Sequence, residues 1–302
     1  MKNREEILRY FPCQLYELLE NTFNQNINIE NNLQEIRIRC NRPIILKIRQ
    51  ADIVIDYKVN QKEILQILEK LCNSSIYAYK NQICEGFITV KGGHRVGITG
   101  TAVIENERII NLKYITSLNF RIAREVLNCS NKILGQIIDK ESNSIYTTLI
   151  VSPPGMGKTT MLRDTIRRIS NGIPEINFKG KTCGVVDERG EIAAIYKGIP
   201  QNDIGIRTDV IDNVPKPEAM RILVRSMAPQ IIACDEIGSK EDIEAINYVM
   251  CSGVKGIFTA HGNDIEDVCK NPWMAQLINN HIFERIIQLN SKQKGDSKCI
   301  IA

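Results

Sequence analysis

A glycine-rich loop between an apolar run and a helical pattern is the feature that most constrains the fold of this 302-residue chain. The loop consists of Ser152, Pro153, Pro154, Gly155, Met156, Gly157, Lys158, Thr159 and Thr160. A predicted buried strand over 145–151 leads into it, and a helical pattern over 159–169 follows. This order of strand, glycine turn and helix is the context that a phosphate-binding loop needs. The alternative is a Gly/Pro turn with one incidental lysine, and the strand before it and the helix after it argue against that interpretation.

Each residue type in this loop suits a polyphosphate. Glycines let the backbone wrap around phosphate with its N–H groups inward, and the helix N-terminus adds a favourable dipole. Lys158 would reach the β- and γ-phosphates of ATP, and the Thr159 hydroxyl would hold Mg²⁺. The pattern departs from G-x-x-x-x-G-K-[ST] at Ser152, which stands where the first glycine usually does. Because serine is small, we expect a usable loop.

Short apolar runs alternate with helical patterns through the second part of the chain. Strands are predicted over 145–151, 183–187, 204–206, 230–234 and 256–260, and helices over 159–169, 217–227 and 239–251, with Ser239 as an N-cap. Near residue 284 the pattern becomes strand–turn–strand, with the turn at 294–296. Nearly continuous apolar strands joined by helices predict an α/β fold, a parallel sheet covered on both faces. Ligands of such sheets bind beyond the carboxyl ends of the strands.

Two carboxylates follow the predicted strand 230–234. Asp235 would hold Mg²⁺ through water, and Glu236 would polarise the attacking water. An ordinary strand that ends in acidic loop residues would be the better reading if the phosphate-binding loop were absent.

Charged residues also follow two other predicted strands. Glu188 is a second candidate for orienting water, and Arg189 for contacting phosphate or a neighbouring subunit; the alternative is a surface ion-pair cluster. His261 could sense the γ-phosphate and couple hydrolysis to movement, or be a structural histidine.

ATP hydrolysis is accelerated by an arginine that stabilises the negative charge developing in the transition state, and this arginine often comes from an adjacent subunit. The candidates are Arg121, Arg124, Arg207 and Arg225. Each could equally be a solvated or salt-bridged surface residue, and the sequence does not choose between these readings.

The first part of the chain has a different pattern, typical of a small α+β domain. Helices are predicted on either side of Pro12, strands over 33–40 and 44–48, a helix over 64–72, and a hairpin of 87–90 with 95–98 around Gly92 and Gly93. Alternation of Ile36 and Ile38 with arginines gives the first strand a basic outer face. We therefore expect an N-terminal α+β domain over 1–125, a linker over 126–143 and a nucleotide-binding domain over 144–302.

Composition narrows the function classes. With 43% hydrophobic and 25% charged residues the chain is typical of a globular protein, and its net charge of +4 gives no strong nucleic-acid signal. The ten cysteines have no Cys-x-x-Cys spacing and are interpreted as small hydrophobic residues in a reducing cytosol. No run approaches the ~20 apolar residues of a membrane span, so work at a membrane would require a partner that recruits the chain.

Several strings together resemble the stage III sporulation protein AA family, RecA-like P-loop ATPases of endospore-forming bacteria that are related to type II and type IV secretion ATPases. The strings lie at 33–39, 117–125, 152–160, 186–193, 225–238 and 259–262, within a resemblance that spans about residues 5–290. The main departure is Ser152 in place of glycine, and Gly190 also stands where the family has a polar residue.

The resemblance implies a RecA-like core that assembles into rings, expected to be hexamers, and that energises a secretion-like channel or its assembly. The chain would act in the mother-cell cytoplasm, peripheral to the membrane through a membrane protein of the channel complex. By motif match, Lys158, Thr159, Asp235 and Glu236 carry over as nucleotide and Mg²⁺ residues. Glu188 corresponds to the acidic box of secretion ATPases, His261 to their histidine element, and Arg121 and Arg124 to interfacial arginines.

The sequence thus predicts a Mg-dependent P-loop ATPase that hydrolyses ATP to ADP and phosphate. Two alternatives stay open. One is a nucleic-acid-dependent ATPase, suggested by the basic face of Arg37, Arg39 and Arg42. The other is a non-hydrolysing, ATP-gated scaffold. Which glutamate activates water also stays open.

Overall fold

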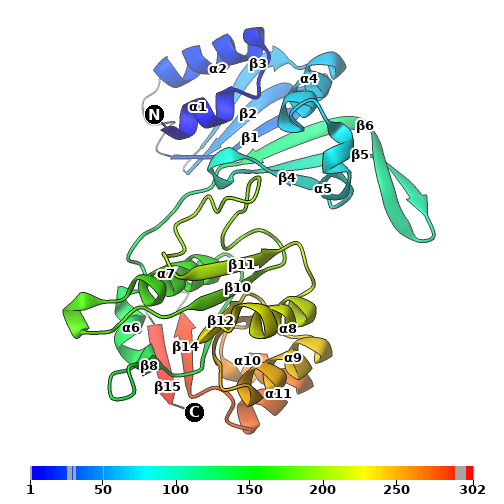
Figure 1. Ribbon diagram of the computed structural model, residues 1–302. Coiled ribbons are helices and arrows are strands. Elements are labelled where there is room, and N and C mark those ends of the chain that lie inside the picture. Colours follow the sequence, from blue (N-terminus) through cyan, green and yellow to red (C-terminus); the bar gives the residue numbers. More distant parts are fainter. Residues whose placement is uncertain (1, 26–28, 30–31, 50, 290–296, 302) are drawn as a thin grey trace. The chain divides into compact units, whose positions relative to one another are not determined.

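The computed structural model describes residues 2–25, 29, 32–49, 51–289 and 297–301. The chain folds into two compact units (Figure 1). The first comprises Met1–Arg124 together with Tyr196–Gln201, and the second comprises Glu125–Ile195 and Asn202–Ala302. No helix in the described part of the chain has the length and apolar character needed to cross a bilayer.

The first unit is built on a six-stranded antiparallel sheet in the order β3-β2-β1-β6-β5-β4. The strands are β1 (Leu33–Arg39), β2 (Pro43–Ile48), β3 (Asp52–Lys58), β4 (Phe87–Thr89), β5 (Arg95–Glu105) and β6 (Arg108–Arg121). The helices are α1 (Lys2–Leu8), α2 (Cys13–Gln25), α4 (Gln61–Leu71) and α5 (Lys80–Cys84), with short 3₁₀ turns at Ile76–Tyr79 and Lys91–Gly93.

One face of this sheet packs against the helices. Ile36 and Ile38 of β1 are fully buried and belong to one core with Leu15 of α2 and Ile64 of α4, whereas Arg37 alternates with them toward the other face. The predicted helix break at Pro12, the two strands and the basic outer face are confirmed.

The predicted hairpin around Gly92 and Gly93 is confirmed as β4 paired with β5, but β5 continues far beyond it. β5 and β6 form a second, longer hairpin that turns at Asn106 and Glu107, both with positive φ. The sequence does not predict this hairpin, because its outer part is mostly exposed and lacks a regular apolar alternation.

The second unit contains a seven-stranded sheet in the order β11-β10-β12-β13-β9-β14-β15. The strands are β9 (Thr148–Ser152), β10 (Cys183–Asp187), β11 (Thr208–Asp212), β12 (Ile231–Cys234), β13 (Lys255–His261), β14 (Arg285–Leu289) and β15 (Ser297–Ile301). All neighbours are parallel except β15, which is antiparallel to β14. The predicted 294–296 turn lies outside the described residues.

Helices cover both faces of this sheet, as predicted. They are α6 (Asn131–Ile137), α7 (Lys158–Asn171), α8 (Lys216–Met227), α9 (Lys240–Cys251), α10 (Ile265–Cys269) and α11 (Pro272–Asn279), with a 3₁₀ turn at Pro174–Ile176. Two apolar cores result: α6 and α7 contribute to one, and α8, α9 and α11 to the other. Every residue of β9, β10 and β12 is buried, which is why these strands read as continuous apolar runs.

Ser239 caps α9 as predicted, in a capping box with Asp242. The strand predicted over 204–206 is wrong. Gly205 has a φ of +89° and Ile206 is 79% exposed, so this segment is a loop. The strand is β11 instead, an edge strand of half-buried residues whose apolar signal is weak.

The segment expected to be a linker, 126–143, carries structure of its own. It contains α6 and β7 (Ile138–Asp139), which pairs with β8 (Ser144–Ile145). Ile133 and Ile137 are fully buried in a core of the second unit. Asp164 of α7 accepts hydrogen bonds from the backbone of Asn128 and from the backbone and hydroxyl of Ser130. In the structure this segment is therefore part of the second unit.

Candidate active site

The phosphate-binding loop joins β9 to α7 at the carboxyl edge of the parallel sheet. Gly155 and Gly157 have φ angles of +75° and +89°, which glycine adopts without strain. A Cβ at either position would meet nothing within 4 Å, so backbone conformation rather than space requires glycine there. Gly157 is the N-cap of α7 and gives no side-chain cap, so no capping side chain competes for the first N–H groups of the helix.

Ser152 occupies the position where the common pattern has glycine. It is the fully buried last residue of β9, and its hydroxyl donates to the carbonyl of Pro153 at 3.1 Å. The backbone is extended there, so nothing in the local conformation requires glycine.

Lys158 is folded back against the base of its own loop. Its ammonium donates to the carbonyl oxygens of Ser152 at 3.0 Å and Pro153 at 3.4 Å, and it lies 2.7 Å from Nδ1 of His261. Burial lowers the pKa of Lys158, and the charges of Asp235 and Glu236 offset part of that effect. The lysine is thus held at the phosphate-binding loop by contacts that a phosphate could replace.

Asp235 is the carboxylate that lies beside the loop. It follows β12, and its two oxygens accept from the hydroxyl of Thr159 at 2.5 Å and from the hydroxyl of Thr259. Adjacent oxygen atoms of a threonine and an aspartate suit Mg²⁺, which usually keeps several waters and substrate phosphates as its other ligands. Among the described residues, no group of three or more His, Cys, Asp or Glu side chains converges on one point.

Glu236 has an unusual backbone and a fully occupied carboxylate. Its φ is +54°, and its N–H donates to the Thr259 hydroxyl at 2.8 Å. One carboxylate oxygen lies 2.7 Å from His261 Nε2, and the other accepts from Arg189 at 2.8 Å. Burial acts to raise the pKa of Glu236, but the hydrogen bond from His261 and nearby positive charges outweigh it and the pKa is lowered.

His261 connects Lys158 to Glu236. An ammonium can only donate, so Nδ1 of His261 accepts from Lys158 and Nε2 carries the hydrogen that points at Glu236. The strand order β12-β13-β9 explains why these groups meet, because Glu236, His261 and Ser152 follow or end three neighbouring parallel strands.

Asp187 at the end of β10 shapes the turn that carries Glu188 and Arg189. It is 2% exposed and accepts three backbone N–H groups, from residues 191 to 193, at 2.8 to 3.0 Å. Burial raises the pKa of Asp187, and these hydrogen bonds act in the opposite direction. Arg163 of α7 holds the same turn by donating to the Ile192 carbonyl at 2.7 Å.

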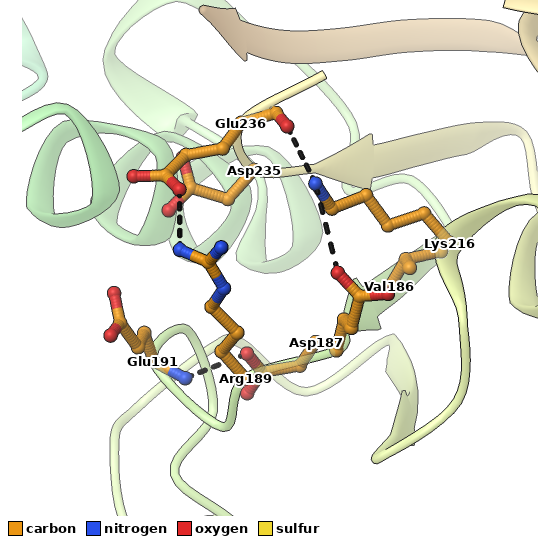
Figure 2. Close-up of a pocket in the computed structure, with 8 residues that line it drawn as sticks. Val186, Asp187, Arg189, Glu191, Lys216, Asp235 and Glu236 are labelled. Carbon is orange, nitrogen blue, oxygen red and sulfur yellow. Dashed lines mark hydrogen bonds and ion pairs between the residues drawn. The ribbon is translucent and has the colours of Figure 1, made fainter. Parts of the chain in front are cut away.

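A pocket lies between this turn and the end of β12 (Figure 2). It is lined by Val186, Asp187, Glu188, Arg189, Glu191, Lys216, Asp235 and Glu236. Figure 2 shows the Arg189 guanidinium reaching Glu236 from one side and Lys216 from another. Five of these residues carry carboxylates and two carry cations, so the lining is net acidic and would favour a divalent cation.

Thr259 and Lys216 are site residues that the sequence does not mark as functional candidates. Thr259 belongs to the string before His261, and its residue type alone indicates no role in the site. Lys216 begins α8 and reaches Glu236 and Glu188 from a segment with no recognised motif. No sequence signal available from one chain would have found Lys216.

The remaining arginine candidates do not line this pocket. Arg225 is exposed in the last turn of α8 and donates to the Arg221 carbonyl of its own helix at 3.3 Å. Arg207 donates to the Ser170 carbonyl at 2.8 Å. Arg121 and Arg124 belong to the first unit. Catalytic roles for these arginines, including action from a neighbouring subunit, stay predictions.

Comparison with solved structures supports the fold described above. Solved structures with a RecA-like fold include two that match this chain over most of its length. The pilus retraction motor PilT with bound ADP matches with a TM-score of 0.60 and 15% identity over 89% of this chain and 76% of that one. The Legionella pneumophila ATPase DotB matches with a TM-score of 0.57 and 13% identity over 90% of this chain and 75% of that one.

The sequence comparisons identify the family. Stage III sporulation protein AA of Bacillus subtilis (strain 168) is 39% identical over 263 residues, which cover 87% of this chain and 84% of that protein. The family model described as sporulation stage III, protein AA matches residues 1–301. The chain therefore belongs to the stage III sporulation protein AA family.

Proposed function

We propose that this protein is a Mg-dependent ATPase. The observation that carries the proposal is the convergence of Lys158, Thr159, Asp235, Glu236 and His261 at the carboxyl ends of neighbouring parallel strands. Phosphoryl transfer to water needs backbone N–H groups and an ammonium that bind the phosphates, a pair of side chains that holds the metal, and a carboxylate that orients the water.

Binding of ATP would exchange the contacts of Lys158. Its ammonium would leave the carbonyls of Ser152 and Pro153 for the β- and γ-phosphate oxygens, while the free N–H groups at the start of α7 bind the phosphates. Thr159 and Asp235 would hold Mg²⁺, which neutralises charge that develops on the phosphates.

Hydrolysis would proceed by in-line attack of a water on the γ-phosphate. Glu236 and Glu188 are the two carboxylates placed to orient that water. Both oxygens of Glu236 are engaged, by His261 and Arg189, so one of these partners must give way before Glu236 can accept from water. Withdrawal of Lys158 from His261 on ATP binding would start that exchange.

Ring assembly, expected to be hexameric, is part of the proposal. Arg189 is the one arginine described as lining the pocket, and it is paired with Glu236. A second arginine at the γ-phosphate would come from another part of the assembly, and the candidates remain Arg121, Arg124, Arg207 and Arg225. Family membership and the likeness to a pilus motor and a secretion ATPase further support a motor that energises a secretion-like channel in endospore formation.

The partner would be a membrane protein of that channel complex, with the ATPase on the mother-cell side. The energising role is tested by complementation of a strain that lacks the gene. A Lys158→Ala allele should fail to restore sporulation, whereas an allele with the exposed control residue changed, Lys179→Ala, should restore it. Equal restoration by both alleles would refute an energising role.

The ATPase proposal is tested by phosphate release from Mg·ATP by wild type, Glu236→Gln and Glu188→Gln, with the particle mass measured with and without ATP. We expect at least one glutamine variant to lose on the order of 100-fold in kcat and keep nucleotide binding. Nucleotide binding and ring formation with no turnover in any protein would favour an ATP-gated scaffold instead.

One observation favours a nucleic-acid-dependent ATPase as a second candidate. Arg37 and Arg39 border a hollow on the outer face of the first unit's sheet, together with Ser117 and Asn119. Stimulation of turnover by single-stranded DNA, falling steeply with salt, would support this role. Turnover that is the same with and without single-stranded DNA at every salt concentration would argue against this role.

A further inference from the structure

Lys216 is the only lysine that reaches the pocket of Figure 2 among the described residues. It is the first residue of α8, after Pro215, and its side chain is 14% exposed. Its ammonium donates to the backbone carbonyl of Glu236 at 2.5 Å and lies 3.7 Å from the nearer carboxylate oxygen of Glu188. One fixed cation therefore contacts both glutamates that could orient the attacking water.

The contact with Glu236 falls on a backbone that needs support. A φ of +54° is uncommon for a residue with a side chain and persists where neighbours over-determine it. Thr259 accepts the Glu236 N–H through its hydroxyl, and its carbonyl accepts the N–H of Ile237 at 2.9 Å. Lys216 binds the carbonyl between these two amides, so the peptide units on both sides of Glu236 are held.

Charge gives Lys216 a second effect that Arg189 cannot replace. Five carboxylates line the pocket, and the Lys216 ammonium beside Glu188 offsets part of their mutual repulsion. Arg189 is 60% exposed and is one of the two partners of the Glu236 carboxylate, one of which must give way before that carboxylate can accept from water. Lys216 is mostly buried and binds the backbone of Glu236, so it can stay in place while that carboxylate changes partners.

We propose that Lys216 is a positioning residue for ATP hydrolysis: it fixes the left-handed backbone of Glu236 and holds Glu188 beside it, so that both carboxylates address one water. This inference rests on the proposed ATPase function. The hydrogen bond and the ion pair of Lys216 go to Glu236 and Glu188 and not to the phosphate-binding loop, so we expect it to act on the water and not on nucleotide affinity.

The test compares kcat and KM for Mg·ATP in wild type, Lys216→Met, Lys216→Gln, Lys216→Arg and Lys240→Met. Lys240 is a matched control, because it is also the first residue of a helix, α9, but is 57% exposed and lies outside the pocket. Melting temperature and ADP affinity are measured for every variant. Glutamine has no charge but can still donate to the Glu236 carbonyl. Lys216→Gln therefore allows the same comparison if Lys216→Met does not fold.

We expect Lys216→Met to lose roughly 100-fold in kcat, the scale of a small misplacement of catalytic groups, with KM and ADP affinity within about threefold of wild type. Lys216→Gln should lose less, Lys216→Arg should recover most of the rate, and Lys240→Met should equal wild type. Combined with Glu188→Gln, the Lys216→Met loss should shrink, because the two residues act as a unit.

Unchanged kcat in folded Lys216→Gln or Lys216→Met would overturn the inference. A raised KM or weakened ADP binding with unchanged kcat would also overturn it, because Lys216 would then bind nucleotide. If wild type hydrolyses ATP no faster than Lys158→Ala, the proposed function itself fails, which is a result distinct from failure of the Lys216 inference.

Discussion

Lys158 Nζ and His261 Nδ1 lie 2.7 Å apart, so the lysine of the phosphate-binding loop is hydrogen bonded to a histidine that ends the neighbouring strand. The same imidazole reaches Glu236 through Nε2 at 2.7 Å. A phosphate that draws Lys158 away therefore removes the donor to Nδ1 of the residue that holds Glu236. This relationship links occupation of the loop to the state of the candidate catalytic carboxylate.

Replacing His261 by asparagine should break this link. We expect kcat for ATP to fall by at least about tenfold with little change in nucleotide affinity, because the imidazole orients Glu236 and does not form the phosphate-binding loop. Steady-state kinetics and ADP titration measure both effects. His281→Asn is the matched control, since His281 is exposed and outside the site; equal losses in both variants would contradict the role of His261.

The Thr159 hydroxyl should be required for the metal. Thr159→Val removes the donor to Asp235 while it keeps the shape of the side chain, so turnover at saturating Mg·ATP should fall on the order of 100-fold. Thr159→Ser should retain most of it and show a shifted Mg²⁺ requirement. Titration of turnover with Mg²⁺ is the measurement, and a Thr159→Val enzyme with the Mg²⁺ curve of wild type would exclude this metal site.

Asp187 should matter for stability more than for chemistry. It is buried and satisfies three backbone N–H groups of the turn after β10. Asp187→Asn places an amide donor against these donors, and we expect about 3 kcal/mol lower free energy of unfolding. Chemical denaturation compares it with Asp209→Asn on β11, whose side chain is partly exposed. Similar stabilities for the two variants would show that the Asp187 cluster contributes little.

His94 should make the stability of the first unit pH-dependent. Its ring is fully buried, and Nδ1 accepts the N–H of Ala123 at 3.0 Å. Burial lowers the pKa of His94 to about 4. Because the unfolded chain takes up this proton near pH 6.5, the stabilisation is complete above that pH and is lost as pH falls through 4, on the order of 3 kcal/mol in total.

The measurement for His94 is the melting temperature between pH 7.5 and 4 in wild type and His94→Gln. Glutamine can still accept the Ala123 N–H but does not titrate. The wild-type curve should fall more steeply than the variant's below pH 6.5. Parallel curves would mean that His94 is protonated at the same pH in the folded and unfolded protein.

Much of the second unit was predictable, because strands that are buried on both faces consist mostly of consecutive apolar residues. β12 is apolar throughout and β10 is apolar up to Asp187, and the phosphate-binding loop, Asp235 and His261 each follow or end a buried strand. A common sheet edge was therefore enough to expect these groups together. The strand order that sets their spacing depends on packing between distant segments, which local patterns do not encode.

What escaped prediction has physical reasons of the same kind. β11 is an edge strand whose residues are all half-buried, so its apolar pattern is weaker than that of the neighbouring loop over 204–206, where the sequence predicts the strand. Lys216 acts through space from the start of a helix, and its neighbours Pro215 and Pro217 form no motif. The conformation of Glu236 is imposed by Thr259 and Lys216, two residues distant from it in sequence.

The phosphate-binding loop and the groups around it are proposed to hydrolyse ATP. This is tested by the rate of phosphate release from Mg·ATP by wild type and Lys158→Ala, with assembly conditions and membrane partner supplied. We predict turnover by wild type and at least about 100-fold less by Lys158→Ala, because its ammonium is the group held ready for the phosphates. Equal rates for the two proteins would contradict the account.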